Sequence, residues 1–291
     1  MNRILVGIDF SAPSRTALAK AVDLSTGHRG KILALHVVEN AMIDSLVEHT
    51  HLERPEIIDN LELRLSRFAA ELSATDSIIE TRVVVGHPVK DFGTTADEFD
   101  PDLVVLGAWG SHGSSKKSAG FTAKQVVQEC RCDAVLVRES AQNSRGVVAC
   151  VDFSAYDKSV VAAAEQLRQQ FFIPLEIIHV FYPSWKIDKF VEKHQEIFDS
   201  DFTQEYKAIL QGKLDNLIPV FEIGSSDVKT TVIECLRHSD GILAHLRKTE
   251  PEIVVIGARG SSRIESMILG RIAERIVTES EASVYLVKEP G

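Results

Sequence analysis

The chain has 291 residues, a length that corresponds to about two domains of ordinary size. Hydrophobic residues make up 44% and charged residues 25%, which excludes a disordered chain, and no apolar run is long enough to cross a bilayer. The net charge of −10 divides at Asn143 into −5 (15 basic and 20 acidic residues) and −5 (17 and 22). Because neither half is basic, the sequence argues against nucleic acids and membrane surfaces as partners.

Four cysteines in a chain of this length do not form a disulfide framework. The apolar run after Met1 is too short for the core of a signal peptide and lacks a small-residue cleavage site. We therefore expect a cytoplasmic location.

The second half of the chain repeats the first. Residues 4–11 (Ile-Leu-Val-Gly-Ile-Asp-Phe-Ser) match residues 147–154 (Val-Val-Ala-Cys-Val-Asp-Phe-Ser) at an offset of 143. Residues 102–111 match residues 252–261 at an offset of 150, so the second copy is longer somewhere in between. The sequence predicts two copies of one domain, residues 1–139 and 145–291, joined by a polar linker within residues 138–145.

Each copy alternates short apolar runs with amphipathic stretches. In the first copy the apolar runs are Ile4–Ile8, Ile32–Val38, Ile79–Val85, Leu103–Leu106 and Ala134–Val137. They are rich in Val, Ile and Leu, which is typical of parallel strands covered on both faces. Helices are predicted at Ser11–Leu24, where Ser11 is the cap, at about Pro55–Leu72 and at Lys124–Cys130. This alternation predicts an α/β fold with an open, mostly parallel sheet in each copy and right-handed crossovers.

An acid follows the first strand of each copy. Asp9 precedes Ser11, and Asp152 precedes Ser154. Ligands of open α/β sheets bind at the carboxyl ends of strands where the strand order reverses, and an acid there accepts hydrogen bonds from a ribose or base, or helps to hold a metal. The same acid would equally well cap the following helix. Both interpretations stay open for these residues alone.

A glycine-rich loop follows the fourth strand of each copy. Its glycines are Gly107, Gly110 and, nine residues later, Gly120 in the first copy, and Gly257, Gly260 and Gly270 at the same spacing in the second. Such a loop before a helix lets backbone N–H groups converge on a phosphate. Its recurrence in both copies predicts a phosphate-binding loop.

Other features favour structural roles. Residues 86–88 (Gly-His-Pro) indicate a turn after the third strand, and we place Phe221–Ser226 at the equivalent point of the second copy. His36 and His179 lie in apolar strands, where a hydrogen-bonded core histidine is the commoner arrangement. The pairs His49/His51 and Cys130/Cys132 lack a second pair at zinc spacing. The aromatic-rich residues 181–206 would cover the sheet or line an apolar ligand cavity.

Taken together and in this order, these features resemble the tandem form of the universal stress protein family. The resemblance covers nearly all of both halves, and it rests on the strand ends at Asp9 and Asp152, the second strands, the Gly-x-Pro turn and the two glycine loops. It implies a five-stranded parallel α/β sandwich in each copy, Rossmann-like and similar to adenine nucleotide alpha hydrolases. Many members of the family bind ATP and others do not, so the implied cofactor is ATP with Mg²⁺.

The resemblance also implies a role for particular residues. The nucleotide-site residues would be Asp9, Ser11, Gly107, Gly110, Gly120 and Thr122 in the first copy, and Asp152, Ser154, Gly257, Gly260, Ser261, Gly270 and Arg271 in the second. In ATP-binding members a Ser or Thr follows the last glycine, whereas Phe121 and Arg271 stand there in this chain. Phe121 offers no donor and Arg271 offers a bidentate phosphate contact, so the second copy is favoured as the nucleotide site.

The leading hypothesis is therefore a cytoplasmic regulatory protein of the stress response that binds an adenine nucleotide. One alternative is a protein with degenerate pockets that acts through its surfaces, as an intramolecular pseudo-dimer of the two copies or as a homodimer. Another is a binder of an apolar small ligand. The last alternative is an enzyme that slowly hydrolyses ATP. The spacing of the residues reveals no nucleophile or general base that would support it.

Overall fold

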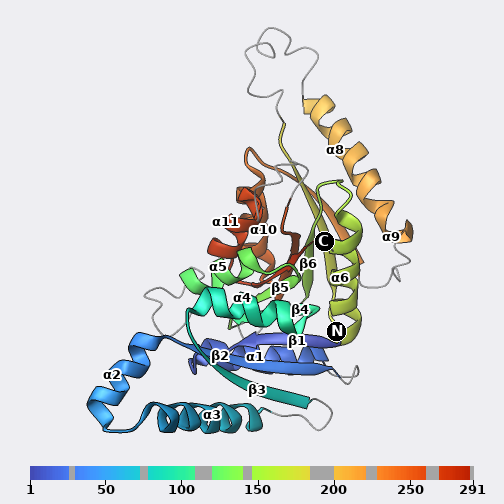
Figure 1. Ribbon diagram of the computed structural model, residues 1–291. Helices are drawn as coiled ribbons and strands as arrows, with labels where there is room; N and C mark the ends of the chain where they lie inside the picture. The colour runs from blue at the N-terminus through green and yellow to red at the C-terminus, as the bar shows by residue number, and fades with distance from the viewer. Residues whose placement is uncertain are drawn as a thin grey trace. The chain divides into compact units, whose positions relative to one another are not determined.

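The computed structural model describes residues 1–25, 30–72, 78–108, 120–139, 146–183, 200–220, 228–259 and 269–288. The chain forms two compact units. The first is built mainly from Met1–Glu139, and the second from the residues that follow, up to Val287. Each unit contains five strands that pair in parallel, with helices between them (Figure 1). The two α/β copies expected from the repeat are therefore present. Among the described residues, no helix is long and apolar enough to cross a membrane.

The first unit follows the predicted alternation of strands and helices. In chain order its elements are β1 (Arg3–Gly7), α1 (Ala12–Ser25), β2 (Lys31–Val38), α2 (Asn40–Thr50), α3 (Arg54–Ala70), β3 (Ile78–Val85), α4 (Pro88–Phe99), β4 (Leu103–Gly107), α5 (Phe121–Glu129) and β5 (Asp133–Val137). The predicted cap of the first helix is confirmed, because the Ser14 N–H donates to the Ser11 hydroxyl oxygen at 3.3 Å.

The strands of the first unit lie in the order β3-β2-β1-β4-β5. The strand order therefore reverses between β1 and β4, because the first strands are added on one side of β1 and the last two on the other. The side chains of β1 and β4 are almost completely buried, because helices cover both faces of these central strands. With right-handed crossovers, α1 and α3 share one face and α4 and α5 share the other. Helix α3 packs along β3 at the edge of this sheet (Figure 1).

The second unit repeats this arrangement. Its elements are β6 (Val147–Cys150), α6 (Asp157–Phe171), β7 (Leu175–Phe181), α8 (Ser200–Asp215), α9 (Leu217–Val220), β8 (Val228–Glu234), α10 (His238–Thr249), β9 (Ile253–Gly257), α11 (Arg271–Glu279) and β10 (Ser283–Val287). The order β8-β7-β6-β9-β10 matches that of the first unit. The strand order therefore reverses between β6 and β9.

One assignment made from the sequence is wrong. Phe221–Ser226 does not follow the third strand of the second copy, because that strand is β8 and begins only at Val228. The turn equivalent to Gly86-His87-Pro88 is therefore Cys235–Arg237, between β8 and α10. β8 is an edge strand with Lys229, Thr230 and Thr231 in its centre, so it lacks the continuous apolar run that marks the inner strands.

The Gly86-His87-Pro88 turn is explained by the start of α4. The His87 N–H donates to the Asp91 carboxylate at 2.6 Å, and Pro88 occupies the first helical turn, where no N–H is needed. A Cβ atom at Gly86 would collide with that carboxylate. The turn predicted for these residues is confirmed, and its composition follows from helix capping.

The second unit contains a half-buried polar cluster centred on Glu176 of β7. Its carboxylate accepts hydrogen bonds from the Thr231 hydroxyl at 2.6 Å and from His245 Nε2 and Lys229 Nζ at 3.0 Å each. Burial raises the pKa of Glu176, but the donors from His245, Thr231 and Lys229 outweigh it and lower the pKa to about 2. The equivalent position in the first unit is the apolar Leu33.

Replacing Glu176 with glutamine is expected to lower the free energy of unfolding at pH 7 by about 2 kcal/mol, because a charge with three donors is lost. The folded pKa lies below the ordinary 4.5, so this stability is present above about pH 5 and lost as the pH falls toward 2. Urea unfolding at pH 7 and pH 3 measures both values. Glu80→Gln, which removes an exposed pair with Lys31, is the control and should change little. Equal losses at both pH values would contradict the argument.

Candidate functional site

The acids that follow the first strands lie where the strand order reverses. β1 pairs with β4 through Val6 and Val105, so Asp9 and Gly107 stand at the carboxyl ends of neighbouring strands. In the second unit Cys150 of β6 pairs with Ile256 of β9, which brings Asp152 and Gly257 to the equivalent point. This is the place where open α/β sheets bind ligands.

Both acids are exposed and belong to tight turns. The Asp9 carboxylate accepts hydrogen bonds from the Ser11 N–H at 3.0 Å and from the Ser11 hydroxyl. The Asp152 carboxylate accepts from the Ser154 N–H at 3.1 Å. These bonds belong to the turn that leads into the first helix of each unit, so the capping role considered for these acids is supported.

The residue between acid and serine has a left-handed backbone in both units. Phe10 has φ 61° and Phe153 has φ 60°, a conformation that is rare for a large side chain. Each ring packs on a histidine, at 4.6 Å between the Phe10 and His36 centroids and at 4.3 Å for Phe153 and His179. This packing stabilises a strained turn at the candidate site.

The two histidines are hydrogen-bonded within the strands, as predicted, and they are partly buried. His36 Nδ1 lies 2.7 Å from the Ile8 carbonyl oxygen, and His179 Nδ1 lies 2.9 Å from that of Val151. Because a carbonyl only accepts, Nδ1 carries the hydrogen in both cases. Burial lowers the pKa of both rings, so both are neutral at pH 7.

The first helix starts at a different place in the two units. Helix α1 begins at Ala12, directly after the turn, whereas α6 begins at Asp157, two residues later than the repeat would place it. In the first unit the Pro13 backbone lies so close to Gly107 that a Cβ there would stand 2.8 Å from the Pro13 carbonyl carbon. A Cβ at Gly257 would stand 2.9 Å from the Arg259 carbonyl oxygen of its own loop, but 3.9 Å from Tyr156, the equivalent of Pro13. The start of the first helix therefore lies less tightly against the strand end in the second unit.

Asp157 is a buried carboxyl group at the second of these sites. It is 5% exposed, its Oδ1 accepts the Asp152 N–H at 3.1 Å, and its Oδ2 has no hydrogen-bond partner among the described residues. Burial raises the pKa of Asp157 to about 6, and the nearby negative charge of Asp152 adds to the increase. Ser14 occupies this position in the first unit.

The glycine loops have the same base in both units. The Gly120 N–H donates to the Ala108 carbonyl at 2.6 Å, and the Gly270 N–H donates to that of Ala258 at 2.7 Å. Gly120 and Gly270 are the N-caps of α5 and α11, and neither helix has a side-chain cap there. The N–H groups of the first turns are thus available to an anion.

Not every residue of the candidate site belongs to the described part of the chain. Gly110, Gly260 and Ser261 lie outside it, and so does the side chain of Phe121. Thr122 and Arg271 are exposed in the first turns of α5 and α11.

The four cysteine thiols are free. Burial raises the pKa of Cys150 to about 12 and that of Cys130 to about 11, so these thiols are unreactive at neutral pH. Within the described ranges, no three His, Cys, Asp or Glu side chains are grouped as a metal site requires.

Asp157 could not be recognised from the sequence, because its burial and its contact with Asp152 arise only in the fold. No spacing in the sequence marks this contact, because Asp152 precedes α6 and the turn between the two acids brings them together. Phe10 and Phe153 were quoted in the repeat, but nothing in the sequence marks their positive φ angles.

Comparisons with known proteins identify the family of the chain. A model of the Universal stress protein family matches residues 1–138 and again residues 144–288. The Universal stress protein YxiE of Bacillus subtilis (strain 168) is 27% identical over 146 residues, which is 47% of this chain and 99% of that protein.

Two solved structures share the fold over the whole chain. A universal stress protein from Archaeoglobus fulgidus DSM 4304 superposes with a TM-score of 0.63 at 17% identity, covering 99% of both chains. The functionally unknown protein PA1789 from Pseudomonas aeruginosa PAO1 gives a TM-score of 0.67 at 12% identity, covering 99% of this chain and 92% of that one.

Proposed function

This chain belongs to the universal stress protein family, and from that premise we propose that it is a regulatory protein of the stress response whose second copy binds an adenine nucleotide. Asp152 would accept hydrogen bonds from the adenosine part. The phosphates would lie against the N-terminus of α11, where Arg271 offers a bidentate contact. The observation that carries the proposal is the meeting of Asp152, Gly257 and an uncapped helix at the reversal of strand order.

The difference between the two helix starts supports the choice of the second copy. In the first unit the backbone of Pro13 lies against Gly107, whereas in the second the turn before α6 keeps Tyr156 further from Gly257. The first turn of α5 holds Phe121 and Thr122 where the second copy has Arg271. A dianionic or trianionic phosphate chain is therefore better matched by the second copy.

Magnesium would reach this site with the nucleotide. Mg²⁺ usually keeps several waters and is held largely by the substrate phosphates, so it would not need Asp152, which is assigned to the adenosine part. Asp157 would not ligate it, because its carboxyl is buried beneath the turn. The ion would neutralise phosphate charge, while the chain's own residues bind and orient the nucleotide.

The test is calorimetric titration of the full chain with ATP and Mg²⁺, with mass spectrometry of any nucleotide that accompanies the purified protein. We expect one ATP per chain, with binding weakened at least about tenfold by Asp152→Ala and by Arg271→Gln. Asp9→Ala, the equivalent change in the first copy, is the matched control and should leave binding unchanged. No heat from the wild type and no retained nucleotide would refute the proposal, and a loss in Asp9→Ala alone would move the site to the first copy.

We also propose residues 1–139 and 145–291 as the boundaries of the two domains, and the cytoplasm as the location. Four free thiols, three of them with a raised pKa, suit a reducing compartment. A pseudo-dimer of the two copies, or a homodimer, stays a prediction that light scattering of the purified chain would measure.

A further inference from the structure

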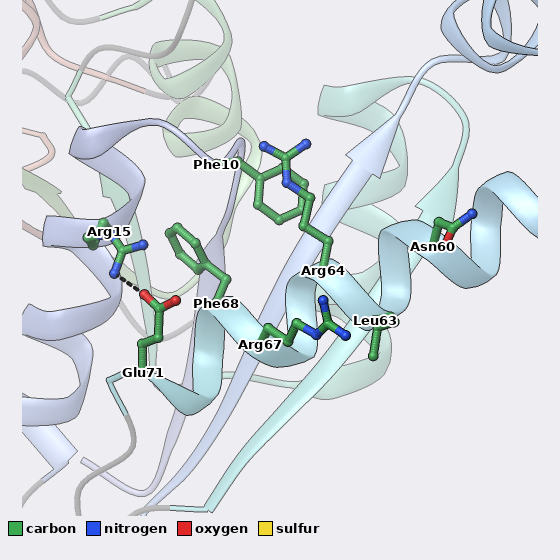
Figure 2. Close-up of a pocket in the computed structure, with 8 residues that line it drawn as sticks. All are labelled: Phe10, Arg15, Asn60, Leu63, Arg64, Arg67, Phe68 and Glu71. Carbon is green, nitrogen blue, oxygen red and sulfur yellow. Dashed lines mark hydrogen bonds and ion pairs between the residues drawn. The ribbon is translucent and has the colours of Figure 1, made fainter. Parts of the chain in front are cut away.

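A cavity of about 360 Å³ lies in the first unit, between α1 and α3 and beside the turn that follows β1. It is formed by the turn after β1, the first part of α1 and one side of α3 (Figure 2). Three arginines, two phenylalanines and an asparagine contribute most of its wall: Arg15, Arg64, Arg67, Phe10, Phe68 and Asn60. Its volume lies at the lower end of the range for small-molecule sites.

The charge of this cavity opposes that of the protein. Its lining carries three guanidinium groups and one carboxylate, Glu71, a formal balance of +2 in a chain of net charge −10. Arg15 pairs with Glu71 at 2.6 Å. No ion pair of Arg64 or Arg67 occurs among the residues that the structure describes. Two uncompensated guanidinium groups therefore face one small volume, which favours an anionic occupant.

Two of the arginines are held on aromatic rings. The Arg64 guanidinium carbon lies 4.2 Å from the Phe10 centroid, and that of Arg15 lies 4.7 Å from the Phe68 centroid. The left-handed backbone of Phe10 places its ring between Arg64 and His36. The ring also packs edge to face on Phe68, with 5.7 Å between the two centroids. A stacked guanidinium keeps its N–H edge free, so it binds a carboxylate or phosphate with little loss of side-chain freedom.

The cavity also offers apolar surface. Leu63 on α3 is 49% exposed beside Arg64 and Arg67, and the ring of Phe10 is only partly buried (Figure 2). An inorganic anion would leave this surface in water. An anion attached to a flat ring would cover Leu63 and stack on the outer face of a guanidinium plane.

The described residues of the second unit offer different chemistry at the equivalent place. Phe153 lies near a cation on the equivalent helix, but this is Lys213, with Nζ 6.0 Å from the ring centroid. A lysine ammonium is a point charge that neither stacks as a plane nor binds bidentately. The part of the second unit that the structure describes therefore does not repeat the stacked guanidinium of Arg64.

We propose that the first copy binds a small aromatic anion, a ring that carries a phosphate or carboxylate group, in the cavity between α1 and α3. Arg64 and Arg67 would bind the anionic group, with Asn60 beside it, while Leu63 and Phe10 contact the ring. The site is separate from the nucleotide site proposed in the second copy. It rests on none of the residues assigned there.

Phenyl phosphate is the probe, and calorimetric titration of the full chain is the measurement. We expect one phenyl phosphate per chain, bound at least about tenfold more tightly than inorganic phosphate, and weakened at least about tenfold by Arg67→Gln or by Arg64→Gln. Arg82→Gln, which removes an exposed pair with Glu98 elsewhere in the first unit, is the charge-matched control and should bind as the wild type does. Circular dichroism confirms that each variant is folded.

Four outcomes would overturn the proposal. They are the absence of binding at millimolar phenyl phosphate, unchanged binding in Arg67→Gln, inorganic phosphate binding as tightly as phenyl phosphate, and loss of binding in Asp152→Ala. The last would mean that the probe occupies the nucleotide site. Retention of phenyl phosphate binding in Asp152→Ala, whether or not ATP binds, keeps the two proposals distinguishable.

Discussion

Replacing Gly107 with alanine is expected to lower the free energy of unfolding by about 2 to 3 kcal/mol. A Cβ at this position would stand 2.8 Å from the carbonyl carbon of Pro13 and 2.9 Å from its Cβ and carbonyl oxygen. Those atoms belong to a rigid proline in the first turn of α1, which packs on β4 and β1. The contact is relieved only if the helix moves off the sheet or β4 bends, and urea unfolding measures the cost.

Glycines in helix interiors provide the control of opposite sign. The nearest atom to a Cβ at Gly93, inside α4, is 4.0 Å away, and at Gly212, inside α8, there is none within 4 Å. Gly93→Ala and Gly212→Ala are therefore expected to stabilise the chain by about 0.5 to 1 kcal/mol, because alanine is the better helix former. Gly257→Ala should also be destabilising, because its Cβ would stand 2.9 Å from the Arg259 carbonyl oxygen, but it should leave the first helix of the second unit in place, since Tyr156 stays 3.9 Å away. A neutral Gly107→Ala would show that α1 is not held against the strand end.

Most of the fold could be predicted because the inner strands are buried on both faces. The buried positions of β1, β4, β6 and β9 have no room for polar side chains, so they form continuous runs of Val, Ile, Leu, Ala and Cys. The repeat then fixes the second copy from the first. β8 was misplaced for the opposite reason, since an edge strand tolerates charged and hydroxyl side chains and loses that signal.

Helix α2 was not predicted, and its packing explains why. Only Ile43 of its eleven residues is buried, in a small cluster with Val38 and Ile57. With only Leu46 and Val47 partly buried beside Ile43, the apolar stripe of this helix spans little more than one turn, too short a pattern to stand out in the sequence. Its existence depends on contacts with α3, which a reading of local periodicity does not contain.

The residues at the strand ends of the candidate site were predicted from the sequence, whereas the cavity between α1 and α3 was not. Asp9, Asp152 and the loop glycines are found from their position after apolar runs. The cavity between α1 and α3 brings Arg15 close to Arg67, which lies 52 positions later in the chain. In the sequence, its residues from α3 look like an ordinary solvated helix face. Only the three-dimensional contact of Arg64 with Phe10 distinguishes them from such a face.

Replacing Asp157 with asparagine is expected to raise the free energy of unfolding at pH 8 by about 1 to 2 kcal/mol and to leave it unchanged at pH 4. The folded-state pKa of Asp157 is about 6, against an ordinary value of 3.8. The folded state thus holds the proton more tightly than the unfolded chain does. The stability that this group contributes is complete below about pH 4 and is lost as the pH rises through 6. Asparagine keeps an oxygen for the Asp152 N–H and never ionises.

Urea unfolding at intervals between pH 4 and pH 8 measures this difference, and Asp59→Asn, an exposed change on α3, is the control that should give a flat profile. A loss of stability at pH 8 in Asp157→Asn would contradict the argument. A gain would mean that the second copy retains a costly buried carboxyl where the first copy has Ser14. A simple turn does not need such a group, whereas a binding site that holds Asp152 in place does. Asp157→Asn should then become more stable while its affinity for ATP falls, because the Asp152 backbone would no longer be held by a charged acceptor.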